Sequence, residues 1–293
     1  MTRLRFLKAA ILETSAGRVI RQTVKGFFDD NGGILAGNLA YLSLLTLFPF
    51  FIFCVSLAGA FGRTDEGLEA VAALISAVPA QVADVLTGPI TEVLAGSARR
   101  GLLTFGAIVT IWTAANFIET VRVVVLVAYD QTTSRSLWFQ RLQSTLLVIA
   151  SALILFSSMI VQFVLNTAQK LLQTYLPWFT GIIDFMKIIG TGVAPVILVL
   201  GLYGIFRALT PREALPSRHW PGALLTAAIW IAATQILPRA LTMMGSYNVT
   251  YGSLAGIIIT LLFFYVLGIG LVLGAQLNAA LRLEALRQAE TLS

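Results

Sequence analysis

The chain has 293 residues, of which 57% are hydrophobic and 12% are charged, and its mean hydropathy is +0.85. Soluble domains carry about 25% charged residues, so this composition cannot cover a water-soluble globule and indicates a protein of the lipid bilayer. The net charge of +6 would also suit nucleic acid, but the basic residues fall in alternate loops, which fits membrane topology better. The single cysteine, Cys54, and the single histidine, His219, exclude an intrachain disulfide and disfavour a zinc site.

Six apolar segments are long enough to cross a membrane. A transmembrane helix needs about 20 mostly apolar residues, and lipid offers no partners for backbone hydrogen bonds, so the segments are expected to be helices. They span residues 34–60, 101–127, 143–166, 187–207, 221–244 and 251–279. The predicted fold class is therefore all-α, a polytopic membrane protein with six transmembrane helices and additional interfacial amphipathic helices.

The segments outside these spans complete the predicted organisation, in which residues 34–279 form the bundle and 280–293 a cytoplasmic tail. Residues 1–33 form a basic cytoplasmic segment. Its amphipathic part, 16–28, is expected to lie on the anionic inner leaflet, with an ordinary solvated helix as the alternative. The outer loop 61–100 has apolar residues at helical spacing and predicts two short amphipathic helices, either at the outer interface or packed as a cap clear of lipid.

The distribution of Lys and Arg orients the predicted bundle. Fourteen of the twenty basic residues fall in the N-terminal segment, the second and fourth loops, the C-terminus and the adjoining helix ends, and six fall on the opposite side. The positive-inside rule then places both termini in the cytoplasm. Trp138, Trp178 and Trp220 lie at predicted span ends, where indole rings anchor at the headgroups.

Polar side chains gather at one predicted depth, in the inner half of the bundle, where their cost in lipid makes them candidate substrate-binding residues. They are Asn38, Tyr41, Asn116, Glu119, Arg122, Gln276 and Asn278. Glu119 and Arg122 are three residues apart, so they can pair on one side of a helix. In one interpretation Arg122 meets an anionic headgroup and Glu119 holds it. In the other, the two charges neutralise each other and the amide side chains only join helices.

Backbone features within the spans allow kinks and close helix contacts. Pro49, Pro195 and Pro238 each remove a backbone donor and can kink their helices, as in transporters, although proline is also ordinary in membrane helices. Gly270 and Gly274 are four residues apart and permit close packing of the last helix.

No sequence motif points to catalysis. The chain has no Walker loop and no dinucleotide fingerprint, His219 lacks a nucleophile-elbow partner, and the 14 acidic residues are mostly scattered in loops. We therefore expect no enzymatic activity, no cofactor, no metal and no nucleic acid partner.

Several motifs resemble a known family. The sequence LAYLSLLTLFP at 39–49 is similar to its first-helix signature, and WTAANF at 112–117 with AYD at 128–130 is similar to its second-helix motif. YGSLAG at 251–256 and GAQLNA at 274–279 resemble its last helix. Together they resemble the YihY/BrkB family of bacterial inner-membrane proteins.

The resemblance runs over about residues 25–280 and implies a six-helix bundle in the bacterial inner membrane. It also implies a role in serum resistance or in moving lipids or lipopolysaccharide precursors. An earlier family name, ribonuclease BN, is regarded as mistaken. The family's last motif usually has Glu where this chain has Gln276, which argues against proton coupling through that position.

The sequence thus predicts a transporter or flippase-like protein for a lipid or other amphipathic envelope molecule. Its expected partners are the lipid bilayer and an anionic lipid or lipopolysaccharide precursor. The alternative is an envelope-integrity or scaffold membrane protein that transports nothing, and a ribonuclease is disfavoured.

Overall fold

The computed structural model describes residues 14–60, 83, 100–131, 136–175, 180–215, 217–243 and 255–292. All secondary structure in these ranges is helical, which confirms the all-α prediction. The α-helices are α2 Ser15–Asp29, α3 Gly32–Ala60, α6 Arg100–Ala128, α7 Leu137–Tyr175, α8 Thr180–Leu209, α9 Trp220–Met243 and α11 Ala255–Leu292, and a short 3-10 helix, η1, spans Arg212–Ala214.

Four stretches of the described helices are long and apolar enough to cross a membrane. They are Gly32–Phe51, Thr104–Ala128, Leu137–Ile154 and Ala255–Thr291. Shorter apolar stretches lie in the two remaining long helices, Pro195–Leu209 in α8 and Trp220–Ile236 in α9. The described part of each of the six predicted spans therefore falls on a helix, and the crossing of the membrane by α8 and α9 stays a prediction.

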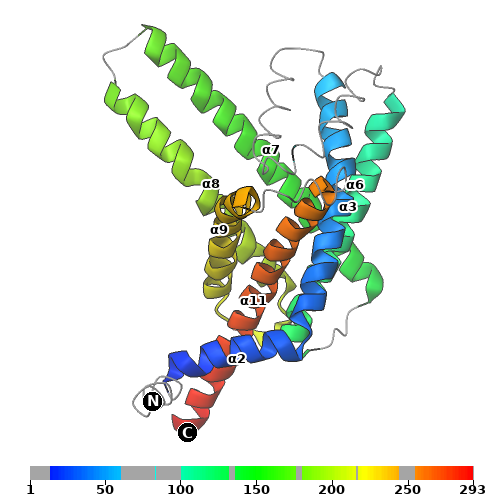
Figure 1. Ribbon diagram of the computed structural model, residues 1–293, viewed down its shortest axis with the longest axis vertical. Helices are drawn as coiled ribbons and strands as arrows, with labels where there is room; N and C mark the ends of the chain where they lie inside the picture. Colours follow the sequence, from blue (N-terminus) through cyan, green and yellow to red (C-terminus); the bar gives the residue numbers. More distant parts are fainter. Residues whose placement is uncertain are drawn as a thin grey trace.

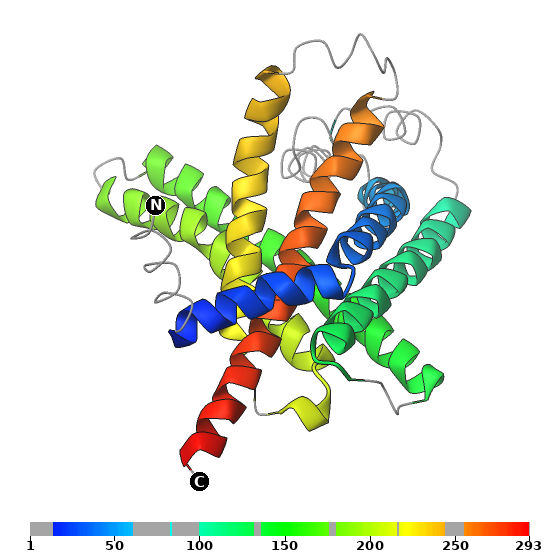
Figure 2. The same cartoon turned by 60° about the horizontal axis from the view of Figure 1, so that its bottom comes forward.

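The core of the bundle forms where α3, α6 and α9 pack around α11 (Figures 1 and 2). Val121 and Val125 of α6 and Ala275 of α11 are fully buried there. Small residues let backbones approach: a Cβ added at Gly268 of α11 would lie 2.7 Å from the carbonyl oxygen of Ala36 in α3. α7 and α8 lean away from this core as a pair (Figure 1).

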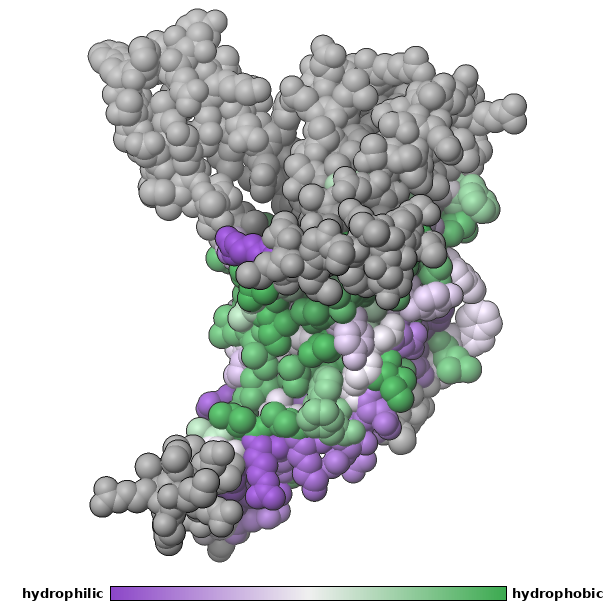
Figure 3. All heavy atoms as spheres, viewed as in Figure 1, coloured by the Kyte–Doolittle hydropathy of each residue, from purple (hydrophilic) through white to green (hydrophobic). Residues whose placement is uncertain are grey.

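Hydropathy divides the described surface into layers. On the face seen in Figure 3, a green, hydrophobic band crosses the middle of the bundle, and hydrophilic residues gather at the end where α2 crosses α11. Arg18 near the start of α2 pairs with Glu284 near the end of α11, at 3.2 Å between Nε and Oε2. The first and last described helices therefore meet at this end of the molecule.

Two helices are longer than their predicted spans. α7 begins at Leu137 rather than at 143: its first turns combine exposed apolar side chains with Gln140, which is buried and whose carbonyl accepts a hydrogen bond from Arg122 of α6 at 3.4 Å. α11 continues through the predicted tail 280–293 as far as Leu292. Most of the outer loop 61–100, with its two predicted amphipathic helices, lies outside the described residues.

Candidate functional site

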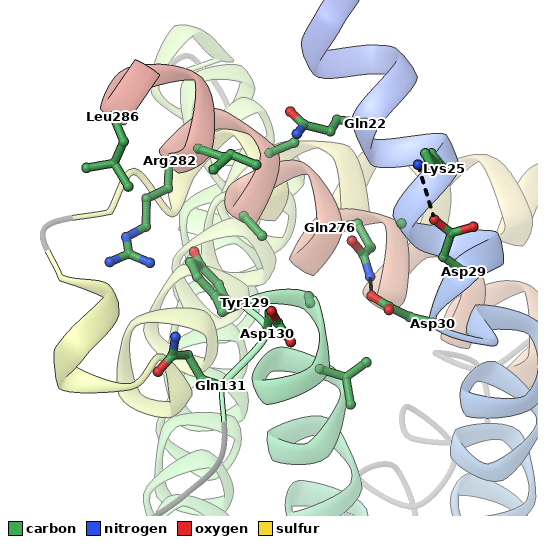
Figure 4. A pocket seen from close by; sticks show the side chains of 16 residues that line it. Gln22, Lys25, Asp29, Asp30, Tyr129, Asp130, Gln131, Gln276, Arg282 and Leu286 are labelled. Carbon is green, nitrogen blue, oxygen red and sulfur yellow. Dashed lines mark hydrogen bonds and ion pairs between the residues drawn. The ribbon is translucent and has the colours of Figure 1, made fainter. Parts of the chain in front are cut away.

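A pocket of about 480 Å³ lies at the hydrophilic end of the bundle (Figure 4). Its walls come from α2, from the end of α6 with the turn that follows, and from the last part of α11. The polar lining residues are Gln22, Lys25, Asp29, Asp30, Tyr129, Asp130, Gln131, Gln276 and Arg282. With three carboxylates and two cations, the pocket suits a polar or zwitterionic group, and ligand pockets span about 300–1,000 Å³.

The helix α2 supplies one wall of the pocket. It begins where the hydroxyl of Thr14 accepts a hydrogen bond from the backbone N–H of Gly17 at 3.2 Å, an N-cap that satisfies a free donor. Ile20, Val24 and Phe28 recur every four residues and are 63%, 47% and 72% exposed. This exposed apolar edge is what an interfacial helix needs to lie against lipid. The amphipathic helix predicted at 16–28 is thus present.

Gln276 joins α11 to the end of α2 across the pocket. Its side-chain amide donates a hydrogen bond to Oδ2 of Asp30 at 2.6 Å (Figure 4). Gly26 makes room for this contact, because a Cβ added there would collide with the Gln276 side chain. Gln276, which is 5% exposed, is therefore the residue of the predicted set that lines the pocket.

The end of α6 places Tyr129 and Asp130 in the opposite wall. The N–H of Asp130 bonds to the carbonyl of Val127 and the N–H of Gln131 to that of Leu126, the two hydrogen bonds of a Schellman helix end. Asp130 has a positive φ of 51°, the conformation that this motif requires. Burial raises the pKa of the Tyr129 phenol above its ordinary value, so the hydroxyl stays protonated and uncharged.

Glu119 and Arg122 form a different polar group, between α6 and α7. The Nε of Arg122 lies 3.2 Å from Oε2 of Glu119, so the predicted pair is present. Its Nη1 donates to Gln143 Oε1 at 3.1 Å, and its Nη2 to Ser144 Oγ at 3.0 Å and to the carbonyl of Gln140 at 3.4 Å. Ser144 in turn donates to Oε1 of Glu119 at 2.6 Å. Arg122 is 5% exposed and hydrogen-bonded at all three guanidinium nitrogens, so it could meet a headgroup only if this network opened.

The remaining predicted residues lie in other places. Asn278 accepts a hydrogen bond from the backbone N–H of Gly222 at 2.8 Å and fastens α9 to α11. Asn116 accepts one from Arg141 of α7 at 2.6 Å. Asn38 and Tyr41 are exposed on α3. Residues predicted at one depth therefore belong to separate contacts, because depth along a helix does not say which way a side chain points.

Several pocket residues were absent from the predicted set. Asp30 and Asp130 each end a helix, where a polar residue signals only a cap when read in sequence. Arg282 lies in the predicted tail, where its guanidinium donates to the carbonyl of Glu213 at 2.7 Å. The AYD segment at 128–130 was the sequence signal that could have identified Tyr129 and Asp130 as site residues. It resembles a family motif, but the resemblance implied no role for it.

The described ranges hold no group of three or more His, Cys, Asp or Glu side chains placed to bind a metal ion.

Comparison with known proteins was made at the level of families, individual relatives and solved structures. The family model for Virulence factor BrkB matches residues 23–292. "Putative ribonuclease-like protein YfkH" of Bacillus subtilis (strain 168) is 28% identical over 247 residues, which cover 84% of this chain and 88% of that protein. No solved structure gives a match.

A second relative is a longer protein. "UPF0761 membrane protein" of Delftia acidovorans (strain DSM 14801 / SPH-1) is 26% identical over 268 residues, which cover 87% of this chain and 60% of that protein. The chain thus spans less than two thirds of the length of this relative.

Proposed function

The chain belongs to the virulence factor BrkB family of membrane proteins, and from that premise we propose that it is an inner-membrane transporter or flippase-like protein. Its substrate would be a lipid or another amphipathic envelope molecule. The polar end of that substrate would enter the pocket between α2, α6 and α11.

The position of the pocket beside an interfacial helix carries this proposal. One side of α2 offers the exposed apolar edge of Ile20, Val24 and Phe28, and another side lines the pocket with Lys25 and Asp29. A molecule with a charged head and an apolar chain needs both surfaces within its own length. Leu283 and Leu286 of α11 add apolar area to the pocket itself.

The test is lipid translocation in proteoliposomes. We would reconstitute the full chain with a fluorescently tagged phosphatidylglycerol in both leaflets, then add a membrane-impermeant quencher. In vesicles without protein, only the probe in the outer leaflet, about half of the total, is quenched. A protein that transports the lipid brings inner-leaflet probe to the outside, so the quenched fraction exceeds one half.

The matched variants are Asp30→Asn and Glu213→Gln. Both remove one carboxylate charge near the same end of the molecule, but Glu213 is exposed and lies outside the pocket lining. Asp30→Asn should slow translocation at least several-fold, and Glu213→Gln should leave it unchanged. If vesicles with the wild-type protein show the same quenching as vesicles without protein, the proposal that the chain transports this lipid is contradicted.

A scaffold role is the second candidate, and the length of α7 favours it. Its 39 residues extend about 58 Å at about 1.5 Å per residue, well beyond a hydrocarbon core of about 30 Å. A vertical α7 would therefore offer surface to a partner outside the membrane. Normal envelope function in cells with a variant that does not translocate lipid would favour this role.

We also propose that the chain is not a ribonuclease, whatever the name of the Bacillus subtilis relative says of that protein. Cleavage of RNA by purified chain, at a rate that follows the protein through successive purification steps, would contradict this.

A further inference from the structure

Arg141, in the second turn of α7, is held in a fixed orientation on the surface of α6. Its guanidinium carbon lies 4.2 Å from the ring centre of Trp112, and its Nη1 donates to Oδ1 of Asn116 at 2.6 Å. Its Nη2 is buried and has no hydrogen-bond partner in the part of the chain that the structure describes. The side chain is therefore positioned, but one strong donor is unused.

The positive charge of Arg141 also lacks a carboxylate partner within the described ranges. The nearby acid of α6, Glu119, already accepts hydrogen bonds from Arg122 and Ser144. Asn116 accepts from Arg141 through Oδ1 but is uncharged, so it does not neutralise the guanidinium. Arg141 is therefore a cation whose described contacts are an amide oxygen and an indole ring.

The surroundings of Arg141 are apolar and exposed. Trp138 is 86% exposed, Leu137 82% and Leu142 58%, and Trp112 itself is 62% exposed. Side chains of this size at the end of a candidate span are typical of a lipid-facing surface. Arg141 lies four residues into the candidate span Leu137–Ile154, and its partners Trp112 and Asn116 lie eight and twelve residues into the candidate span Thr104–Ala128, so the site belongs to the apolar stretch of both helices.

We propose that Arg141, Trp112 and Asn116 form a site for the phosphate group of an anionic membrane lipid, on the exposed surface where α6 meets α7. A guanidinium presents a planar fork of donors that matches phosphate oxygens, and stacking on an indole fixes the plane of that fork. Exposed apolar neighbours would lie along the acyl chains. The site goes beyond the proposed transport function, because it is separate from the pocket and would bind lipid whether or not the protein moves it.

The experiment measures binding of dioleoyl phosphatidylglycerol to the purified full chain by native mass spectrometry from detergent. Arg141→Gln should weaken binding about tenfold or more, since a lost hydrogen bond to a charged group has about that effect. Arg141→Lys keeps the positive charge but loses the planar fork of donors, so its lipid affinity should lie between those of wild type and Arg141→Gln. Arg218→Gln, at an exposed position elsewhere, removes the same charge and is the matched control.

Two further arms make the result decisive. Inorganic phosphate is added as a competitor: displacement of the lipid at similar concentrations would assign the site to free phosphate and overturn the lipid proposal. Circular dichroism and thermal unfolding check that the Arg141 variants remain folded. Equal lipid affinity of folded Arg141→Gln and wild type, or an equal loss in Arg218→Gln, would also overturn it.

Discussion

Asp130 occupies a backbone position that glycine would fill with less strain. Its φ of 51° lies in the left-handed region, which costs an ordinary L-residue about 1–2 kcal/mol and Asp somewhat less. The carboxylate it carries lines the pocket at the end of α6. A strained residue whose side chain faces a pocket is a reason to expect a functional role there.

Replacing this residue separates stability from function. Asp130→Gly should raise the free energy of unfolding by about 0.5–1 kcal/mol, because glycine adopts this conformation freely. The same variant should slow lipid translocation. Thermal unfolding in detergent checks the first effect, with Asp29→Gly as control: Asp29 is the last residue of α2, where glycine should destabilise. Equal losses of stability in both variants would show that strain at Asp130 does not matter.

His219 is the second residue with a specific expectation. It is 1% exposed, and burial, together with the positive charge of Arg207, lowers its pKa below the ordinary value of 6.5. The fold therefore favours the neutral ring. The neutral His219 ring should make its full contribution to stability when the pH is above the pKa of this ring in the unfolded chain. The contribution should be lost as the pH falls toward the lower pKa of the ring in the folded protein.

Because His219 is the single histidine, its ring signals in a nuclear magnetic resonance titration need no assignment. We expect a midpoint below pH 6.5 and a melting temperature that falls on acidification. His219→Asn should remove that part of the acid sensitivity. A midpoint at or above 6.5 would show that the ring is solvated.

At the scale of elements, α9 and α11 meet backbone to backbone. A Cβ added at Gly222 would collide with the carbonyl oxygen of Gly274 and with Asn278. We expect Gly222→Ala to destabilise the protein by about 2 kcal/mol or more, as overpacking of a tight contact does. Gly201→Ala in α8 is the matched control, since a Cβ there meets nothing within 4 Å. It should be neutral or stabilising by up to about 1 kcal/mol. Thermal unfolding of both variants decides, and a similar change in the two would contradict the contact.

The elements could be predicted from the sequence because lipid imposes one pattern, a long apolar run, and the described part of each predicted run lies on a helix. The extensions of α7 and α11 beyond the predicted spans could not be predicted in this way. The first turns of α7, before the predicted span 143–166, read as a loop, since Gln140 and Arg141 have low hydropathy, yet Gln140 is buried. Hydrogen bonds from Arg122 of α6 to the carbonyl of Gln140 and the hydroxyl of Ser144 stabilise this part of α7, and hydropathy does not reveal them.

The candidate site was less predictable than the helices. Rise per residue gave Gln276 and Asn278 similar depths, but these residues lie on different sides of α11 and bond to α2 and α9, respectively. The partner of Gln276 is Asp30, 246 positions earlier in the chain. The packing of α2 against α11 brings Gln276 and Asp30 together, and a single sequence does not reveal which distant residues pack against each other.

At the scale of the whole molecule, the first described helix, α2, and the C-terminal end of the last one, α11, must lie on the same side of the membrane. Arg18 and Glu284 form an ion pair, and the Gln288 amide lies 3.4 Å from the hydroxyl of Ser15. This agrees with the predicted cytoplasmic location of both termini, which stays a prediction.

Cysteine labelling tests that orientation. Cys54 is the single cysteine, so Cys54→Ser gives a background without thiols, to which Ser15→Cys or Thr291→Cys is added separately. Both positions should resist an impermeant maleimide in intact cells and react in inverted vesicles. Labelling of both from outside would reverse the orientation, and labelling of one alone would contradict the contact between α2 and α11.

The close contact of α9 with α11 decides which parts of the protein can move. It runs from Gly222 and Gly274 to the indole N–H of Trp230, which donates to the carbonyl of Leu267 at 2.9 Å. No layer of side chains separates the two backbones at the glycines, so neither helix can slide or roll without breaking it. In the proposed transport function we therefore expect α9 and α11 to move as one unit, with any motion occurring elsewhere, for example in α2 or where α7 is hydrogen-bonded to α6. A pair of spin labels on α9 and α11 should then report one unchanging distance.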